Sequence, residues 1–258
     1  MLRRQIRAIV PSESTGTIQM KRTAAINGVA IAIVALGIGL VGCGSTSGSN
    51  NSSNKTSAAT SAGKTTTTTT AKPQSKVAPR PSVQGPNPTV ASYIQQNGIT
   101  ETQVHRGDPG APTIDLPIAD GWADAGRDTP ARAYWAIVDN GPEAAKYTPS
   151  IVATVTKLAG NADQQKILDL AGGELKNLPG FKPMGDGAAA TLAGFPAYQF
   201  GGTWVDGGQT KAVAQKTVVI ASGNALYVMR LNADCLEDQI GQALPATINI
   251  DEQAKITV

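Results

Sequence analysis

The chain has 258 residues, of which 41% are hydrophobic and 16% charged, a formal net charge of +3 and a single histidine. Residues 1–89 hold ten basic residues and one acidic residue, whereas residues 90–258 hold 12 basic and 18 acidic residues, a formal charge of −6. The C-terminal part therefore has no basic patch with interleaved aromatic residues, which disfavours nucleic-acid binding, and one histidine excludes a histidine-rich metal site.

The N-terminal region has the pattern of a bacterial lipoprotein export signal. A positive segment at residues 20–22 precedes an apolar run over residues 24–41, and Gly42 precedes Cys43. Positive, apolar and small-residue segments in this order form a cleavable signal peptide. A thiol is required to take a diacylglycerol in thioether linkage, and a small residue before it suits the signal peptidase. We therefore predict that the chain is cut before Cys43 and that Cys43 carries the lipid.

The predicted signal peptide comprises residues 1–42. Its residues 1–19 have no place in a short positive segment, so we interpret them as an upstream extension, with translation starting at Met20. A long positive region that is cleaved with the rest is the alternative. An uncleaved transmembrane helix over residues 24–41 is also open, although this run is close to the shortest apolar span that crosses a bilayer. In either case we expect the remaining chain to lie on the extracytoplasmic face of the cell membrane. The sequence does not decide whether it also reaches the cell wall or the cell surface.

A segment poor in large apolar residues follows the predicted lipid site. Residues 44–88 are mostly Ser, Thr, Asn, Gly, Ala, Lys and Pro, with six consecutive threonines at residues 65–70. Such a composition cannot bury enough surface to offset the chain entropy of folding. We predict that residues 43–88 form a lipidated, disordered tether that shares no core with the domain. Hydroxyl density with interspersed proline suits O-glycosylation, and an unmodified spacer is the alternative.

Residues 89–258 are long enough for one domain with a single core. Helical spacing of apolar residues predicts helices over residues 89–96 and 161–178, and a third helix that starts at Asp234 with Leu236, Ile240 and Leu244 facing inward. Runs rich in β-branched and aromatic residues between turn signals predict strands over residues 113–118, 133–138, 150–158, 181–191, 195–205, 209–221 and 225–232.

The late strands form a meander. Asp206-Gly207-Gly208 is a hairpin signal between two long strands, and Ser222-Gly223-Asn224 is the next turn. Gly172 and Gly173 lie inside the predicted helix at residues 161–178, where we expect the helix to approach the sheet closely. The fold class is therefore α+β: an antiparallel sheet flanked by helices in an α/β/α sandwich, preceded by the tether.

From about Gly107 onward the chain resembles the LpqN-type lipoproteins of mycobacteria, whose domain has a PsbP-like α/β/α fold. The motifs that carry the resemblance are Ile114-Asp115-Leu116-Pro117 with Gly121-Trp122, Ala133-Tyr134-Trp135-Ala136, Leu178-Pro179-Gly180-Phe181, Gly194-Phe195-Pro196-Ala197, and Ala225-Leu226-Tyr227-Val228 with Leu231-Asn232-Ala233. These are packing and turn signatures rather than catalytic ones. The resemblance implies an envelope-anchored protein without established catalysis and a domain that serves as a protein-binding scaffold.

Few residues with catalytic chemistry remain. His105 lies in a loop, so we expect an exposed bystander, and we expect Cys235 to be a buried thiol at the start of the last helix. The glycine-rich stretch at residues 201–208 has no following helix to bind a phosphate, so it predicts a hairpin. Two carboxylate pairs fall in turns and at helix starts, where they cap amides: Asp120 with Asp124 and Glu237 with Asp238. We predict no enzymatic activity, no cofactor and no metal site.

The sequence therefore favours a tethered module that binds a protein partner in the cell envelope or on a host surface. Trp204, beside the hairpin signal, is the candidate interaction residue if its side chain is exposed by more than about a third. A rim residue of the core is the favoured interpretation of Trp204. The alternatives are a carrier for a lipid or glycan, which requires a large apolar cavity, and a hydrolase, which requires shifted titratable groups gathered in a pocket.

Overall fold

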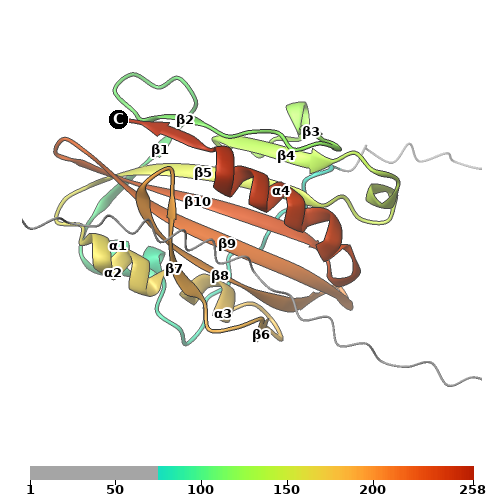
Figure 1. Ribbon diagram of the computed structural model, residues 1–258. Coiled ribbons are helices and arrows are strands. Elements are labelled where there is room, and N and C mark those ends of the chain that lie inside the picture. Colours follow the sequence, from blue (N-terminus) through green and yellow to red (C-terminus); the bar gives the residue numbers. More distant parts are fainter. Residues whose placement is uncertain (1–74) are drawn as a thin grey trace, which may run out of the picture. The chain divides into compact units, whose positions relative to one another are not determined.

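The computed structural model describes residues 75–258. The predicted signal peptide, Cys43 and the tether up to residue 74 lie outside the described residues. Within residues 75–258, no helix is long and apolar enough to cross a membrane. The predicted antiparallel sheet with flanking helices is confirmed (Figure 1).

The main sheet is antiparallel and has nine strands. Its order is β3-β4-β5-β10-β9-β8-β6, with β1 also paired to β5 and β7 also paired to β8. The strands of the main sheet are β1 Thr100–Val104, β3 Trp122–Asp124, β4 Trp135–Asp139, β5 Ser150–Ala159, β6 Lys182–Pro183, β7 Ala188–Leu192, β8 Phe195–Asp206, β9 Gln209–Ser222 and β10 Ala225–Leu236. The short strands β2 Thr113–Asp115 and β11 Lys255–Thr257 pair in a separate sheet.

Four α-helices flank the main sheet in the described part of the chain: α1 Val90–Gln96, α2 Gln164–Leu170, α3 Gly173–Lys176 and α4 Ile240–Gln253. Because side chains alternate between the faces of a strand, β10 shows which helices cover which face. Met229 packs in one cluster with Ala246 and Ile250 of α4, whereas Val228 packs with Ile167 of α2. We call the first side the α4 face and the second the strap face.

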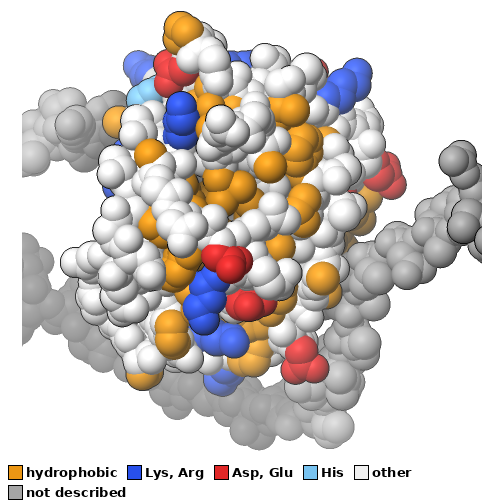
Figure 2. All heavy atoms as spheres, turned by 90° about the vertical axis from the view of Figure 1, so that its left-hand side faces the viewer, with side chains coloured by type: hydrophobic (Ala, Val, Ile, Leu, Met, Phe, Trp, Pro, Cys, Tyr) orange, Lys and Arg blue, Asp and Glu red, His pale blue; other side chains and the backbone are white. Residues whose placement is uncertain are grey.

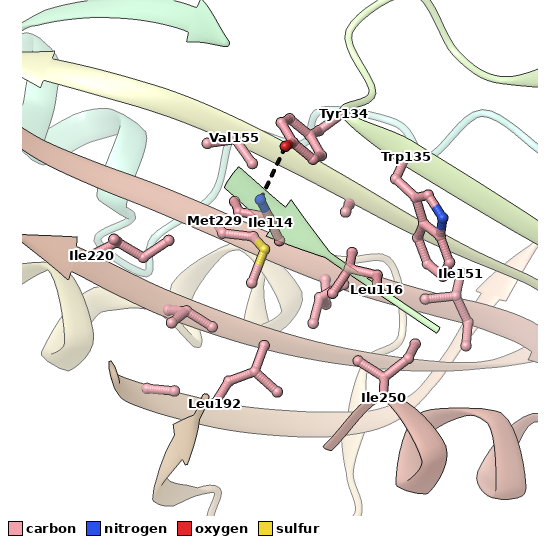
Figure 3. Close-up of a cluster of buried hydrophobic side chains, with 14 of the residues drawn as sticks. Ile114, Leu116, Tyr134, Trp135, Ile151, Val155, Leu192, Ile220, Met229 and Ile250 are labelled. Atoms are coloured by element: carbon pink, nitrogen blue, oxygen red, sulfur yellow. Dashed lines mark hydrogen bonds between the residues drawn. The ribbon is translucent and has the colours of Figure 1, made fainter. Parts of the chain in front are cut away.

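The α4 face carries the largest apolar cluster. Ile137, Ile151 and Met229 of three neighbouring strands are buried there. Figure 3 shows Ile151 and Met229 together with Ile114 of β2. The hydroxyl of Tyr134 accepts a hydrogen bond of 3.2 Å from the Ile114 amide, which ties the small sheet to the core. Burying each such aliphatic side chain contributes about 1.5–3 kcal/mol, so this face supplies a large share of the stability.

The strap face is covered differently along its length. Helices α1 and α2 cover one end, where Val90 and Ile167 pack against Val219 and Val228. Helix α3 covers Trp204 and neighbouring residues of β8 and β9. Across the remaining part runs the segment of residues 75–88, which we call the strap.

The strap is a correction to the predicted tether. Val77 is 5% exposed and packs against Ala136 and Val138 of β4, and Val83 packs against the cluster around Trp204. The last fourteen residues of the predicted tether therefore share a core with the domain. The prediction missed them because two isolated valines among prolines and polar residues lack strand or helix periodicity.

Several predicted elements differ in extent. The segment predicted as one helix over residues 161–178 divides into α2 and α3. Gly172, between them, lies so close to β8 that a Cβ would be 3.2 Å from Phe200. Gly173 instead lies against the strap, where a Cβ would be 1.9 Å from the Pro88 carbonyl oxygen. The close approach to the sheet is thus confirmed for Gly172 only.

The last helix begins later than predicted. β10 continues to Leu236, since Asp234 pairs with Val213 of β9 and Ser150 of β5 instead of starting a helix. The buried face of α4 is accordingly Ala243, Ala246 and Ile250, and the predicted inward residues Ile240 and Leu244 are only partly buried. Sequence periodicity also did not predict the short strands β1, β3 and β11.

Candidate functional site

A polar pocket lies on the strap face at the end of β10. Arg80 of the strap enters it and donates from Nη1 to Oδ1 of Asn232 at 2.7 Å and from Nη2 to the Ala233 carbonyl oxygen at 3.3 Å. Its Nη2 also lies 3.8 Å from Oδ2 of Asp234. Asn232 and Asp234 both point to the strap face because they are two residues apart on one strand. Their oxygens form an acceptor-rich wall around the guanidinium.

The loop before β5 closes the pocket. The Tyr147 hydroxyl donates a hydrogen bond to Oδ1 of Asp234. Buried Gln239 fixes this loop by donating to the backbone carbonyl oxygens of Glu143 and Tyr147 at 2.9 and 2.8 Å. The start of the last helix therefore positions Tyr147, a residue that the sequence did not single out.

A second cation lies beside the pocket. Lys211 Nζ forms an ion pair of 2.6 Å with Asp206 and lies 4.8 Å from the Tyr147 ring centroid and 5.5 Å from that of Trp204. A cation over aromatic faces is attracted by the ring quadrupoles. Across the strap, Arg230 faces Glu174 of α3 at 3.7 Å. The strap face thus carries ion pairs in which cations that are largely covered face partners of differing exposure, from 12% for the Asp234 side chain to 44% for that of Asp206.

Burial shifts the titration of this cluster. It raises the pKa of Tyr147 above its ordinary 10.0, and the charge of Asp234 raises it further. On the opposite, α4 face of β10, where Cys235 packs with Ala243, burial raises the pKa of Cys235 to about 12, with Asp234 and Asp238 adding to the effect. Burial lowers the pKa of Arg80 below its ordinary value, while Asp234 and Glu174 oppose that shift. A tyrosine and a thiol held protonated at neutral pH donate hydrogen bonds and do not act as nucleophiles.

An open groove of about 620 Å³ lies at the other end of the sheet, beside the β9–β10 turn. Leu158, Leu226 and Tyr227 line it together with the backbone of Gly160 and Gly223. Figure 2, which views this end of the molecule, shows hydrophobic side chains gathered between polar ones. Lys157 lies 5.9 Å from the Tyr227 ring centroid at its rim. The groove is separate from Arg80 and Tyr147, the groups on the strap face whose pKa values are shifted.

Trp204 is not an exposed interaction residue. Its side chain is 2% exposed and packs in the cluster with Leu175, Phe200 and Val213. The interpretation as a core residue is therefore confirmed, and Trp204 is removed as a candidate for direct contact with a partner. The close packing of α3 over the hairpin, which sequence spacing does not report, buries it.

The other predicted site residues lie apart. Cys235 is buried and free as predicted, but it ends β10 rather than starting a helix. His105 follows β1 in a loop with its side chain 55% exposed. Asp124 accepts a hydrogen bond of 2.7 Å from the Gly126 amide, a turn-capping role. Among residues 75–258, no group of three His, Cys, Asp or Glu side chains is arranged to hold a metal ion. The lipidation site Cys43 lies outside the described residues.

The fold and these sites define an α+β domain with an antiparallel sheet, covered on one face by a helix and on the other by short helices and an extended strap. Residues 86–257 match the profile of the family described as Probable lipoprotein LpqN. The chain belongs to the LpqN lipoprotein family.

Two relatives agree with this assignment. Lipoprotein LpqN of Mycobacterium tuberculosis strain H37Rv is 51% identical over 173 residues, which cover 67% of this chain and 75% of that protein. A crystal structure of LpqN of M. tuberculosis, described as involved in cell envelope biogenesis, has 50% identity and a TM-score of 0.64, covering 67% of this chain and all of that one. The yeast Ran-binding protein Mog1p is 14% identical with a TM-score of 0.38 over 60% of this chain and 95% of that one, which carries no argument about function.

Proposed function

We propose that the chain is a lipoprotein held at the extracytoplasmic face of the cell membrane by a lipid on Cys43. Its domain is, in this proposal, a non-enzymatic module that binds a protein partner in the cell envelope or at the host interface. The relative described as involved in cell envelope biogenesis supports an envelope role. The lipoprotein family supports the anchor.

The strap is the observation that carries the binding role. The domain holds an extended segment of its own chain across a sheet face through side chains, with Val77 buried and Arg80 bonded to Asn232. Protein-binding domains commonly hold extended peptides through such side-chain pockets. A surface built to hold one extended segment supports a role in peptide recognition, whereas the raised pKa of Tyr147 argues against nucleophilic use of this residue.

The anchor is tested with Cys43→Ala. The variant should accumulate as an uncut precursor and incorporate no labelled palmitate, whereas the wild-type chain should fractionate with membranes. Each buried methylene contributes about 0.8 kcal/mol, so two or three acyl chains make release negligible. Equal palmitate incorporation by both chains would refute lipidation at Cys43.

The binding role is tested by photo-crosslinking the lipidated chain in the envelope and identifying proteins attached to it. The same chain with crosslinkers on the α4 face instead of the strap face is the control. Proteins enriched only from the strap face support the module. Recovery of a lipid or glycan with no crosslinked protein would favour the second candidate, a carrier that uses the groove beside Tyr227.

A further inference from the structure

The pocket around Arg80 has the chemistry of a guanidinium site. Acceptors converge on the guanidinium from three consecutive residues of β10: Oδ1 of Asn232, the Ala233 carbonyl oxygen and, farther off, Oδ2 of Asp234. Tyr147 and Gln215 orient the wall, since Tyr147 donates to Asp234 and Gln215 Nε2 donates to Asn232 at 3.0 Å. A planar fork of donors matches such an array, and an ammonium does not.

Arg80 uses this site only in part. Its Nε has no hydrogen-bond partner within residues 75–258, and its Nη2 stays 3.8 Å from Asp234, beyond the usual length of a charge-assisted hydrogen bond. A guanidinium that approached from a different backbone position could bond to Asp234 directly. The site therefore has unused capacity for an arginine other than Arg80.

The strap is held in a manner that suits exchange. Val77, Arg80 and Val83 recur every three residues and point to the sheet, which is the period of a polyproline II segment, and Pro79 and Pro81 lie between them on the exposed side. Such a segment forms no hydrogen-bonded ladder with a strand. Its contacts with the domain include these side chains and, at its end, the hydrogen bonds of Asn87 with Asn177 and with the Lys176 carbonyl oxygen.

Arg80, the strap residue that fills the pocket, lies outside the residues that match the LpqN family profile. The LpqN profile matches from residue 86, whereas the pocket residues Tyr147, Asn232 and Asp234 lie within the match. The pocket is thus built from the family domain, and its present occupant is not.

We propose that the pocket of Asn232, Ala233, Asp234 and Tyr147 is a guanidinium-recognition site that Arg80 fills in cis and that an arginine in an extended, proline-flanked peptide of a partner protein fills in trans. This inference rests on the proposed role as a protein-interaction module and specifies the chemistry of the partner segment. The strap then acts as a built-in competitor that a better-fitting arginine displaces.

The recognition site is tested by chemical rescue in the chain from residue 44 onward, with the whole domain retained. Arg80→Ala should lower the melting temperature, and millimolar ethylguanidinium should restore part of the loss in a saturable way. Ethylammonium, which lacks the planar fork, should not. The control is Arg132→Ala, which removes an exposed arginine and should show neither loss nor rescue. In Arg80→Ala with Asp234→Asn the rescue should be weaker.

The trans recognition is tested with a labelled peptide of residues 75–89 added to the Arg80→Ala chain. The peptide should bind about tenfold or more tightly than the same peptide with Arg80→Ala, since hydrogen bonds from a charged donor are lost. It should also bind the wild-type chain more weakly than the Arg80→Ala chain, because Arg80 competes.

Equal response to ethylguanidinium and ethylammonium, or equal binding of the two peptides, would overturn the inference. Neither assay involves a natural partner, so these outcomes would leave the proposed interaction role standing. Conversely, rescue and arginine-dependent peptide binding would stand even if crosslinking identified no protein in the envelope.

Discussion

The two faces of the sheet are stabilised by different kinds of interaction. The α4 face buries a continuous set of aliphatic and aromatic side chains from eight strands, with Ile137 and Met229 fully buried. The strap face divides into an apolar part beneath the short helices and a polar part where Arg80, Asp234 and Lys211 meet. Apolar burial is non-directional and tolerant, whereas buried charges require each specific partner. The α4 face therefore supplies much of the stability of the fold, and the strap face is the one for which we propose selective recognition.

The largest expected effect comes from the apolar part of the strap face. Trp204→Ala should lower the free energy of unfolding by about 3–5 kcal/mol, the cost of removing a core aromatic side chain. Val205→Ala on the same strand is the matched control, since Val205 is 45% exposed and should change stability by less than about 0.5 kcal/mol. Denaturant unfolding of both variants measures the difference. A near-neutral Trp204→Ala would show that α3 does not pack over the hairpin.

Adjacent residues of β10 sample the two faces directly. Met229→Ala on the α4 face should cost about 2–5 kcal/mol because it leaves a cavity in a closely packed core. Arg230→Ala on the strap face should cost about 1 kcal/mol or less, since its ion pair with partly exposed Glu174 spans 3.7 Å and such pairs contribute little. Equal losses in urea unfolding would contradict the division between the faces.

Truncation measures how much of the strap belongs to the domain. A chain that starts at residue 75 should melt like one that starts at residue 44, whereas a chain that starts at Thr89 should lose about 2 kcal/mol. The loss combines the exposure of Val77 with the removal of the Arg80 contacts to Asn232 and Asp234. Calorimetry of the three chains decides the boundary. Identical melting temperatures would restore the boundary at residue 89 that the sequence predicted.

The smallest effect at neutral pH concerns Cys235. Its pKa is raised by burial from 9.0 to about 12, so its contribution to stability is fully present below pH 9 and is lost as the pH rises toward 12. Cys235→Ala should change the free energy of unfolding by no more than about 1 kcal/mol at pH 7. Above pH 9, the free energy of unfolding should fall less steeply with pH in the variant than in the wild-type chain. Denaturant unfolding of both chains at pH values from 7 to about 11 measures this pH dependence. A parallel decline in variant and wild type would show that the thiol is not buried.

The sequence determined the sheet and its hairpins because their signals are local. Alternating β-branched residues between turns predicted β5, β8 and β9 nearly to their ends, and Asp206-Gly207-Gly208 predicted the hairpin between β8 and β9. The buried thiol of Cys235 was also predicted, because a nucleophilic thiol would need the single histidine, His105, as its partner. The export signal with Cys43 is likewise a sequence pattern, and it remains a prediction outside the described residues.

Only the tertiary structure decided the place of the strap and the composition of the pocket. Val77, Arg80 and Val83 contact strands 50 to 150 residues further along the chain, and nothing in their own neighbourhood distinguishes them from the rest of a proline-rich segment. Tyr147 and Asp234 meet only because β10 extends past the predicted helix start and because Gln239 holds the loop before β5. Local periodicity reports which face of an element is apolar, but the partner that covers that face is selected by long-range packing, which leaves no signature in any short stretch of residues.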